Sequence, residues 1–241
     1  MGFFKKFTEA GSMSMETAGS LRDGKDIWGL AKLKSKTILV GDDEINGYLL
    51  LNNSHEVGKA MTMMFTPIRV VCNNTLTLAL QQNGSRFRVL HVQMFDEEIV
   101  AAAENALGLS SNAMTEFSEQ AEFLSTKRAT ESQLDNYVAE LFQPKTLIER
   151  GKSSNDNLPA LRDEFKRTAL SVREAIETSP GSGMVSAKGT WWGALNGVTF
   201  VTDHLKKSRT EGNSLHSAWF GSGANVKRRA LDKAIEYAKA A

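Results

Sequence analysis

The sequence predicts an α+β fold, in which an antiparallel sheet of about five strands precedes a helical C-terminal half. Two observations support this prediction. Residues 1–95 contain short β-branched and aromatic runs that end at turn residues, in the order of four strands, a short helix and a strand. Residues 96–241 instead repeat apolar residues at helical spacing. We expect the helical half to pack on the same sheet, so that the chain forms one domain.

The first four strands are predicted by their hydrophobic pattern and by the turns between them. The run ETAGSLRDGKDIWGLAKL is typical of a hairpin, because two strand-capable segments flank residues 22–25 and Asp-Gly is a favoured turn. INGYLLLNNSH and KAMTMMFTPIRVV give the third and fourth strands. Pro67 in the fourth strand indicates an edge or a bulge, since proline has no N–H to donate to a neighbouring strand.

The stretch PIRVVCNNTLTLAL, residues 67–80, changes character at Cys72-Asn73-Asn74. Before this junction it is β-branched and strand-like, and after it the leucines suit a short buried helix. Asn73 or Asn74 can cap this helix by accepting from its first free amides. The other asparagine is then a candidate for contact with a phosphate or a base edge. SRFRVLHV supplies the fifth strand.

Helices dominate the sequence after residue 95. Asp96-Glu97-Glu98 favour the start of the first, because acidic side chains complement the helix dipole, and Thr130 or Ser132 begins the second. PGSGMVSAKG is a flexible break. The five predicted helical stretches are FDEEIVAAAENALGLSSNAMTEFSEQAEFLSTKRAT, TESQLDNYVAELF, LPALRDEFKRTALSVREAIET, TWWGALNGVTFVTDHLKKS and NVKRRALDKAIEYAKAA.

Composition limits the class of protein. A hydrophobic content of 41% is enough for a sizeable core. The sequence has no apolar run of about 18 residues, so we expect no membrane span. The start MGFFKKFTEAG lacks the apolar region of a secretory signal. The single cysteine excludes an internal disulfide. We therefore expect a cytoplasmic protein.

Charge is unevenly distributed along the chain, although the net charge is only +1. Residues 1–40 sum to +3 and residues 41–95 to zero, whereas residues 96–150 sum to −7 and residues 151–241 to +5. An acidic segment between two basic ones is compatible with a polyanionic partner that contacts both ends. The alternative is that the helix surfaces simply vary in charge.

Motifs for catalysis are missing from the sequence. It has no common phosphate-binding loop, zinc-protease motif or serine-hydrolase motif. The four histidines are scattered, whereas a metal site needs three or four ligands. We therefore expect no metal, no cofactor and no enzymatic activity. The enzymatic alternative is an unrecognised site around Cys72, Asp203 and His204, although Cys72 is more simply a small buried residue at a strand end.

Aromatic and basic residues gather near the C-terminus, in TWWGALNGVTFVTDHLKKSR and HSAWFGSGANVKRR. Single-stranded nucleic acids are bound by surfaces of this kind, because aromatic rings stack on bases and cations contact phosphates. At helical spacing the aromatics can equally pack the helix onto the sheet. We expect Trp219 to be exposed in a Gly/Ser-rich loop, next to the basic residues Lys227, Arg228 and Arg229.

Several of these motifs resemble the phage/plasmid-like family of domains of unknown function. They are METAGSLRDGKDIWGLAKL, PIRVVCNNTLTLAL, TWWGALNGVTFVTDH and HSAWFGSGANVKRRAL, and the resemblance runs from about residue 3 to about residue 238. It implies a phage or plasmid context and, because the chain would work in the bacterial host, a cytoplasmic location there.

A weaker similarity concerns the fold alone. A curled antiparallel sheet followed by a helix is similar to the core of phage single-strand annealing proteins. This similarity implies that a groove between sheet and helix binds the DNA backbone. The candidate contact residues are then Lys59, Arg69, Asn73, Asn74, Arg86 and Arg88.

The leading hypothesis is therefore a non-enzymatic, oligomeric phage protein that binds single-stranded DNA and, in the narrower form, anneals it. Annealing needs no metal and no catalytic acid or base. The first alternative is a phage-encoded interaction protein that modulates a host system without binding DNA, through the acidic helices of residues 96–150. The second is the enzyme with an unrecognised site.

Overall fold

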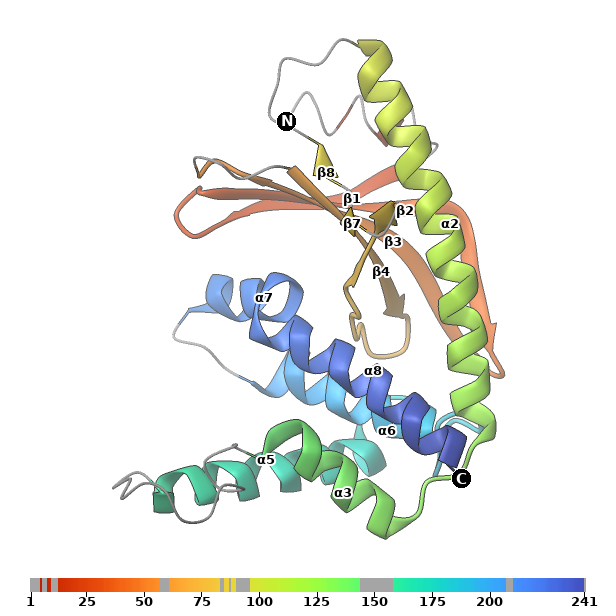
Figure 1. The fold of residues 1–241 in the computed structure, drawn as a ribbon, viewed down its shortest axis with the longest axis vertical. Helices are drawn as coiled ribbons and strands as arrows, with labels where there is room; N and C mark the ends of the chain where they lie inside the picture. Colours follow the sequence, from red (N-terminus) through yellow and green to blue (C-terminus); the bar gives the residue numbers. More distant parts are fainter. Residues whose placement is uncertain are drawn as a thin grey trace.

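The computed structural model describes residues 5, 8–9, 13–56, 61–82, 85–86, 88–89, 96–143, 158–206 and 210–240, and it has the predicted α+β architecture (Figure 1). The sheet lies above α6, α7 and α8 in this view, α3 and α5 lie below these helices, and α2 runs along one side. The strands are β1 Met13–Leu21, β2 Asp26–Val40, β3 Asp43–Ser54, β4 Met61–Arg69, β5 Leu78–Ala79, β6 Gln81–Gln82, β7 Ser85–Arg86 and β8 Arg88–Val89. The helices are α2 Asp96–Thr126, α3 Glu131–Phe142, α5 Leu158–Thr178, α6 Trp191–Phe200, the π-helix η1 Val201–Leu205, α7 Glu211–Phe220 and α8 Ser222–Ala240.

Four long antiparallel strands form the sheet in the order β1-β2-β3-β4, and the short strands β5 and β8 both pair with β4. The predicted first hairpin is confirmed, because Leu21 pairs with Asp26 and residues 22–25 form the turn. Arg22, Asp23 and Gly24 have φ angles of 53°, 56° and 86°. A left-handed turn of this kind matches the twist of the strands that it joins.

The segment after β4 is extended, so the predicted helix from Asn74 is wrong. Thr75 forms an isolated bridge with Ile68 of β4, and β5 pairs with the same strand. The chain reverses at Asn73, whose φ of 54° is left-handed. Asn74 therefore caps no helix, and its side chain takes part in a different contact described below.

The predicted fifth strand, SRFRVLHV, is present in its described part as two short strands. β7 pairs with β6, whereas β8 returns to the sheet and places Arg88 beside Thr62. Positions 87 and 90–92 lie outside the described residues.

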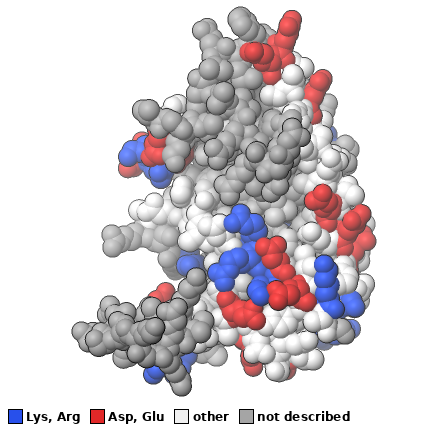
Figure 2. Space-filling view, in the orientation of Figure 1, with Lys and Arg blue, Asp and Glu red and all other residues white. Residues whose placement is uncertain are grey.

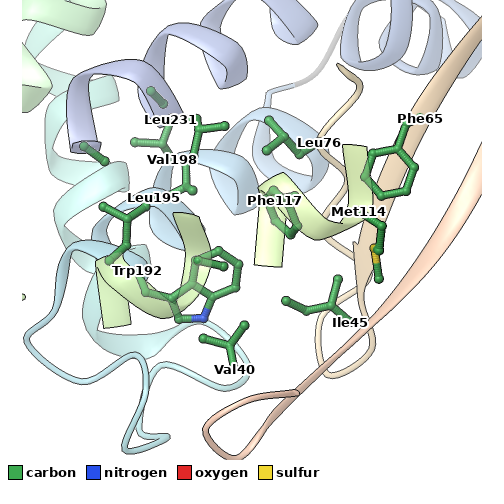
Figure 3. Packing of buried hydrophobic residues seen from close by; sticks show 14 of the residues in the cluster. Val40, Ile45, Phe65, Leu76, Met114, Phe117, Trp192, Leu195, Val198 and Leu231 are labelled. Atoms are coloured by element: carbon green, nitrogen blue, oxygen red, sulfur yellow. The ribbon is translucent and has the colours of Figure 1, made fainter. Parts of the chain in front are cut away.

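One hydrophobic cluster joins the sheet to the helices (Figure 3). Burying a large apolar side chain contributes about 1.5–3 kcal/mol, so this cluster is the main stabilising feature of the fold. The residues labelled in the figure are Val40, Ile45, Phe65 and Leu76 from the first half, Met114 and Phe117 from α2, Trp192, Leu195 and Val198 from α6, and Leu231 from α8.

A second apolar cluster lies on the opposite face of the sheet. Leu49 and Leu51 belong to the first cluster, whereas Leu50 between them packs in the second with Trp28 and with Trp219 of α7. Successive strand residues point to opposite faces. Helix α7 therefore covers the face of the sheet opposite to the one that carries Leu49 and Leu51.

The helix starts follow their sequence signals. Thr130 and Gln133 form a reciprocal capping box at the start of α3, as expected. Thr190 caps α6, and a Cβ at Gly193 would lie 2.0 Å from the carbonyl oxygen of Ala187. Only glycine permits this close approach, so the TWWG motif is explained by backbone packing.

Residues 211–220 form α7, so the prediction of a loop around Trp219 is wrong. The side chain of Thr210 accepts from the amide of Asn213 and caps this helix, and Gly221 ends it. In the part of the chain that the structure describes, no helix combines the length and apolar character needed to cross a membrane.

Candidate nucleic-acid interface

Arg69 lies in a buried ion pair at the end of β4. Its Nε is 2.5 Å from Asp43 Oδ2, which also accepts from Trp192 Nε1 over 2.9 Å. The other guanidinium nitrogens donate to the carbonyl oxygens of Pro180 and Gly181 over 3.2 and 2.9 Å. The side chain is 2% exposed. Arg69 therefore ties the sheet to the turn before α6 and has no accessible surface for a DNA strand.

Asn74 and Thr75 continue this polar connection toward the helices. Asn74 Nδ2 donates to the carbonyl oxygen of Asn196 over 3.0 Å and to Thr199 Oγ1 over 2.9 Å. Both the amide and the hydroxyl of Thr75 donate to Asp203 Oδ2, over 2.7 and 3.0 Å. Asn74 and Thr75 therefore dock the extended segment onto α6 and η1.

Lys227 completes the same buried network from α8. Its Nζ is 2.5 Å from Asp203 Oδ1 and 2.7 Å from Thr75 Oγ1, and the side chain has no solvent exposure. Burial lowers the pKa of Lys227, while the carboxylate of Asp203 opposes this shift. Lys227 is therefore a structural cation inside the protein.

Trp219 is also enclosed, at 8% exposure. Its ring meets Trp28 edge-on, with centroids 4.8 Å apart and an interplanar angle of 87°. The expected exposure of Trp219 is thus wrong, because α7 directs this ring onto the sheet.

The remaining candidates differ in accessibility. Asn73 and Arg229 are exposed, and Arg229 donates to the carbonyl oxygen of Glu140 over 2.8 Å. Arg228 is half-buried and donates to Asn225 Oδ1 over 3.0 Å. Lys59 lies outside the described residues, and of Arg86 and Arg88 only the backbone is described. DNA contact by any of these residues stays a prediction.

The residues of the enzymatic alternative have separate surroundings. Asp203 faces Lys227, while His204 is exposed and lies against Phe200 at 4.9 Å between ring centroids. Cys72 accepts from Arg69 at 3.7 Å. Across the described ranges, no three His, Cys, Asp or Glu side chains are grouped so that they could hold a metal ion.

Cys72 is expected to react slowly with thiol reagents in the folded protein. It is buried, and burial raises the pKa of its thiol, which lowers the fraction of reactive thiolate. Ellman's reagent at pH 8 should modify the native protein at least about tenfold more slowly than the urea-unfolded protein. Equal rates in the two states would mean an accessible, activated thiol and would favour the enzymatic alternative.

Two neighbouring cavities lie between the sheet and the helices. The first, about 320 Å³, is here called the sheet cavity. The second, about 700 Å³, is the helix cavity. Leu80 and Arg228 line both, so the cavities adjoin at these two residues, and the pair is here called the Arg228 groove. Further lining includes Asn52, Thr62, Met64, Phe220 and Asn225 in the sheet cavity and Asn112, Glu116, Gln120 and Asp232 in the helix cavity.

Charges around this groove are mixed. Figure 2 shows basic and acidic side chains next to one another over the region of α8. Among the described residues that line the sheet cavity, Arg228 is the only charged one, whereas Glu116 and Asp232 make the helix cavity more acidic. An anion in the groove is therefore favoured at the Arg228 side of the sheet cavity.

Sequence reasoning identified Arg228 but missed the polar lining of the sheet cavity. Asn52 and Thr62 face each other in the β3–β4 register, and Thr77 reaches the cavity from the extended segment. The available signal in the sequence was a polar residue next to an apolar run in each strand, namely Asn52 after three leucines in β3 and Thr62 between two methionines in β4.

Comparison with known proteins yields one family. Residues 1–219 match the model of the domain of unknown function DUF932. Neither the curated proteins nor the solved structures contain a match. Because the family model spans most of the 241 residues, the chain belongs to the DUF932 family.

Proposed function

We propose that the protein is a non-enzymatic, single-stranded DNA-binding protein of phages or plasmids, and that the DNA strand lies in the Arg228 groove. The observation that carries the proposal is the position of Arg228, where the two cavities meet. One guanidinium there can contact a phosphate while bases enter a cavity lined by amides, hydroxyls and an aromatic ring. The proposal thus assigns the phosphate contact to Arg228 and no longer counts the buried residues Arg69, Asn74, Trp219 and Lys227 as DNA contacts.

Annealing is the narrower form of this proposal. A protein that holds phosphates and leaves base edges free to pair needs no catalytic group. A continuous strand would have to pass along several copies of the chain, so the proposal includes a homo-oligomer in the bacterial cytoplasm. The similarity of a sheet-and-helix groove to annealing proteins supports the idea by analogy only.

The alternative of a protein-interaction factor has support from α2. This helix exposes several glutamates, and an acidic helix face suits a basic protein partner. Such a factor would bind no single-stranded DNA at low salt, so a titration with a labelled single strand separates the two functions. The exposed glutamates of α2 are Glu97, Glu98, Glu104, Glu116, Glu119 and Glu122.

Replacing Arg228 with alanine is expected to weaken binding of a labelled single-stranded oligonucleotide about tenfold, because a hydrogen bond to a charged group contributes about 1.5–3 kcal/mol. The log–log slope of affinity against salt should become shallower by about 0.7, the value for one lost phosphate contact on single strands. Fluorescence anisotropy at low and at physiological salt measures both quantities.

Arg229→Ala is the matched control. It removes the same charge from the adjacent position of α8, but Arg229 points to α3 and donates to Glu140. Its affinity should stay close to that of the unchanged protein. Equal losses in both variants would place the strand elsewhere, and a complete lack of binding at low salt would remove the proposal in favour of the interaction factor.

A further inference from the structure

Two residues that line the sheet cavity carry buried hydrogen-bonding atoms that the described part of the protein leaves unused. Asn52 Oδ1 and Thr77 Oγ1 are both buried, and within the described part of the chain neither has a partner. Thr77 is 5% exposed, and both residues line the cavity. An unpaired buried polar atom is costly, so a ligand that supplies an N–H or accepts from the hydroxyl recovers a lost interaction.

An aromatic ring borders the same cavity. Phe220 ends α7 and is half-buried, so part of its ring is available. Trp219 holds this ring edge-on, with centroids 6.3 Å apart and an interplanar angle of 81°, and is itself packed on Trp28. The phenyl ring therefore packs against the Trp219–Trp28 pair, which restricts its motion, as a stacking surface requires.

The guanidinium of Arg228, which lines the sheet cavity, is held in place by a hydrogen bond. Asn225 accepts from Arg228 over 3.0 Å, and both residues line the sheet cavity. The lining of this cavity of about 320 Å³ thus combines a guanidinium held by a hydrogen bond, an aromatic ring and two residues with an unpaired polar atom. A nucleotide unit carries the complementary groups, since it has a phosphate, a flat aromatic base and an N–H-bearing edge.

We infer that the sheet cavity is a pocket for one unstacked nucleobase of the bound strand. Phe220 stacks on the base, Asn52 and Thr77 hydrogen-bond its edge, and Arg228 contacts the adjoining phosphate. This inference rests on the proposed function, but it adds that affinity depends on bases as well as on backbone charge. Contacts to bases also explain how the groove could hold DNA, although Arg228 is the one described cation that lines it.

The test compares two labelled oligonucleotides of equal length and charge, an oligodeoxycytidylate of about 15 nucleotides and its abasic counterpart. The intact oligonucleotide should bind at least about tenfold more tightly, since stacking of a base on an aromatic ring contributes that much. Phe220→Leu and Thr77→Val should each reduce this ratio without changing the salt slope. Thr77→Val should fold normally, because it removes an unpaired hydroxyl at constant shape.

Phe165→Leu and Thr115→Val are the matched controls. Phe165 is half-buried on α5, and Thr115 is exposed on α2 with its hydroxyl bonded to Ser111. Both should leave the ratio unchanged. Equal affinity for intact and abasic strands would overturn the base pocket and leave backbone binding in place. Failure of both strands to bind would overturn the proposed function and the pocket together.

Discussion

Replacing Arg69 with methionine is expected to lower the free energy of unfolding by about 3–5 kcal/mol, the cost of removing one partner of a buried ion pair. The variant leaves the carboxylate of Asp43 fully buried with Trp192 Nε1 as its remaining donor. It also leaves the carbonyl oxygens of Pro180 and Gly181 without their guanidinium partner. Urea denaturation followed by circular dichroism measures the change.

Arg173→Met is the matched control, since it deletes the same side chain from a more exposed ion pair with Glu131 on α3. Surface pairs contribute about 0–1 kcal/mol, so this variant should lose little. Adding Asp43→Asn to Arg69→Met should restore part of the stability, because it removes the uncompensated charge. Equal losses in Arg69→Met and Arg173→Met would contradict the structural role of Arg69. Loss of DNA binding in an Arg69 variant is evidence for a DNA contact only if the variant is shown to fold.

Local signals predicted much of the fold. The Asp-Gly turn specifies the first hairpin, because its left-handed residues suit the strand twist. The capping box at Thr130 and Gln133 fixes the start of α3 with atoms only three residues apart. Long apolar repeats at helical spacing predicted α2, α5 and α8 for the same reason. All of these features depend on neighbours in the sequence.

The segment 74–80 shows where local reasoning fails. Its Thr-Leu-Thr-Leu-Ala-Leu run has leucines at every second position, which fits a strand as well as a short helix. Leu76 and Leu80 are buried, and so are Thr75 and Thr77. Both faces of an extended segment are covered only when β4 and the helices enclose it. That enclosure depends on residues distant in the sequence, so the short run alone could not distinguish strand-like from helical spacing.

The candidate site was predictable only in part, because burial of a charge depends on a partner distant in sequence. Arg69 lies 26 positions from Asp43, and Lys227 lies 24 positions from Asp203. Lysine and arginine side chains are usually exposed, so a basic cluster in the sequence predicts a solvated surface. Arg228 fits this expectation better than Arg69 or Lys227, since its side chain is only half-buried and lines the groove. The helix α7 likewise turned Trp219 inward and left Phe220 partly open.

Replacing Lys227 with methionine is expected to destabilise the protein by about 3–5 kcal/mol, since the carboxylate of Asp203 loses its buried cation. Methionine fills much of the same volume, so the loss reflects charge more than packing. Thr75 also loses its contact with Nζ, which weakens the attachment of the extended segment to α8. Thermal unfolding and urea denaturation should agree on a large shift, together with faster amide exchange around residues 74–80.

Lys233→Met tests whether this effect comes from burial or simply from loss of a lysine on α8. Lys233 pairs with Glu140 and Glu236 at 2.9 and 2.8 Å, but its side chain is 35% exposed, so water and salt screen these pairs more than a buried one. Its variant should unfold close to the unchanged protein. If Lys227→Met were equally mild, Lys227 would not be the buried partner of Asp203, and an accessible lysine would return to the set of DNA contacts. If Lys227→Met alone is severe, the basic run Lys227-Arg228-Arg229 divides into a structural residue, a groove residue and a surface residue. Three consecutive cations would then have three different roles, set by the helix faces on which they lie.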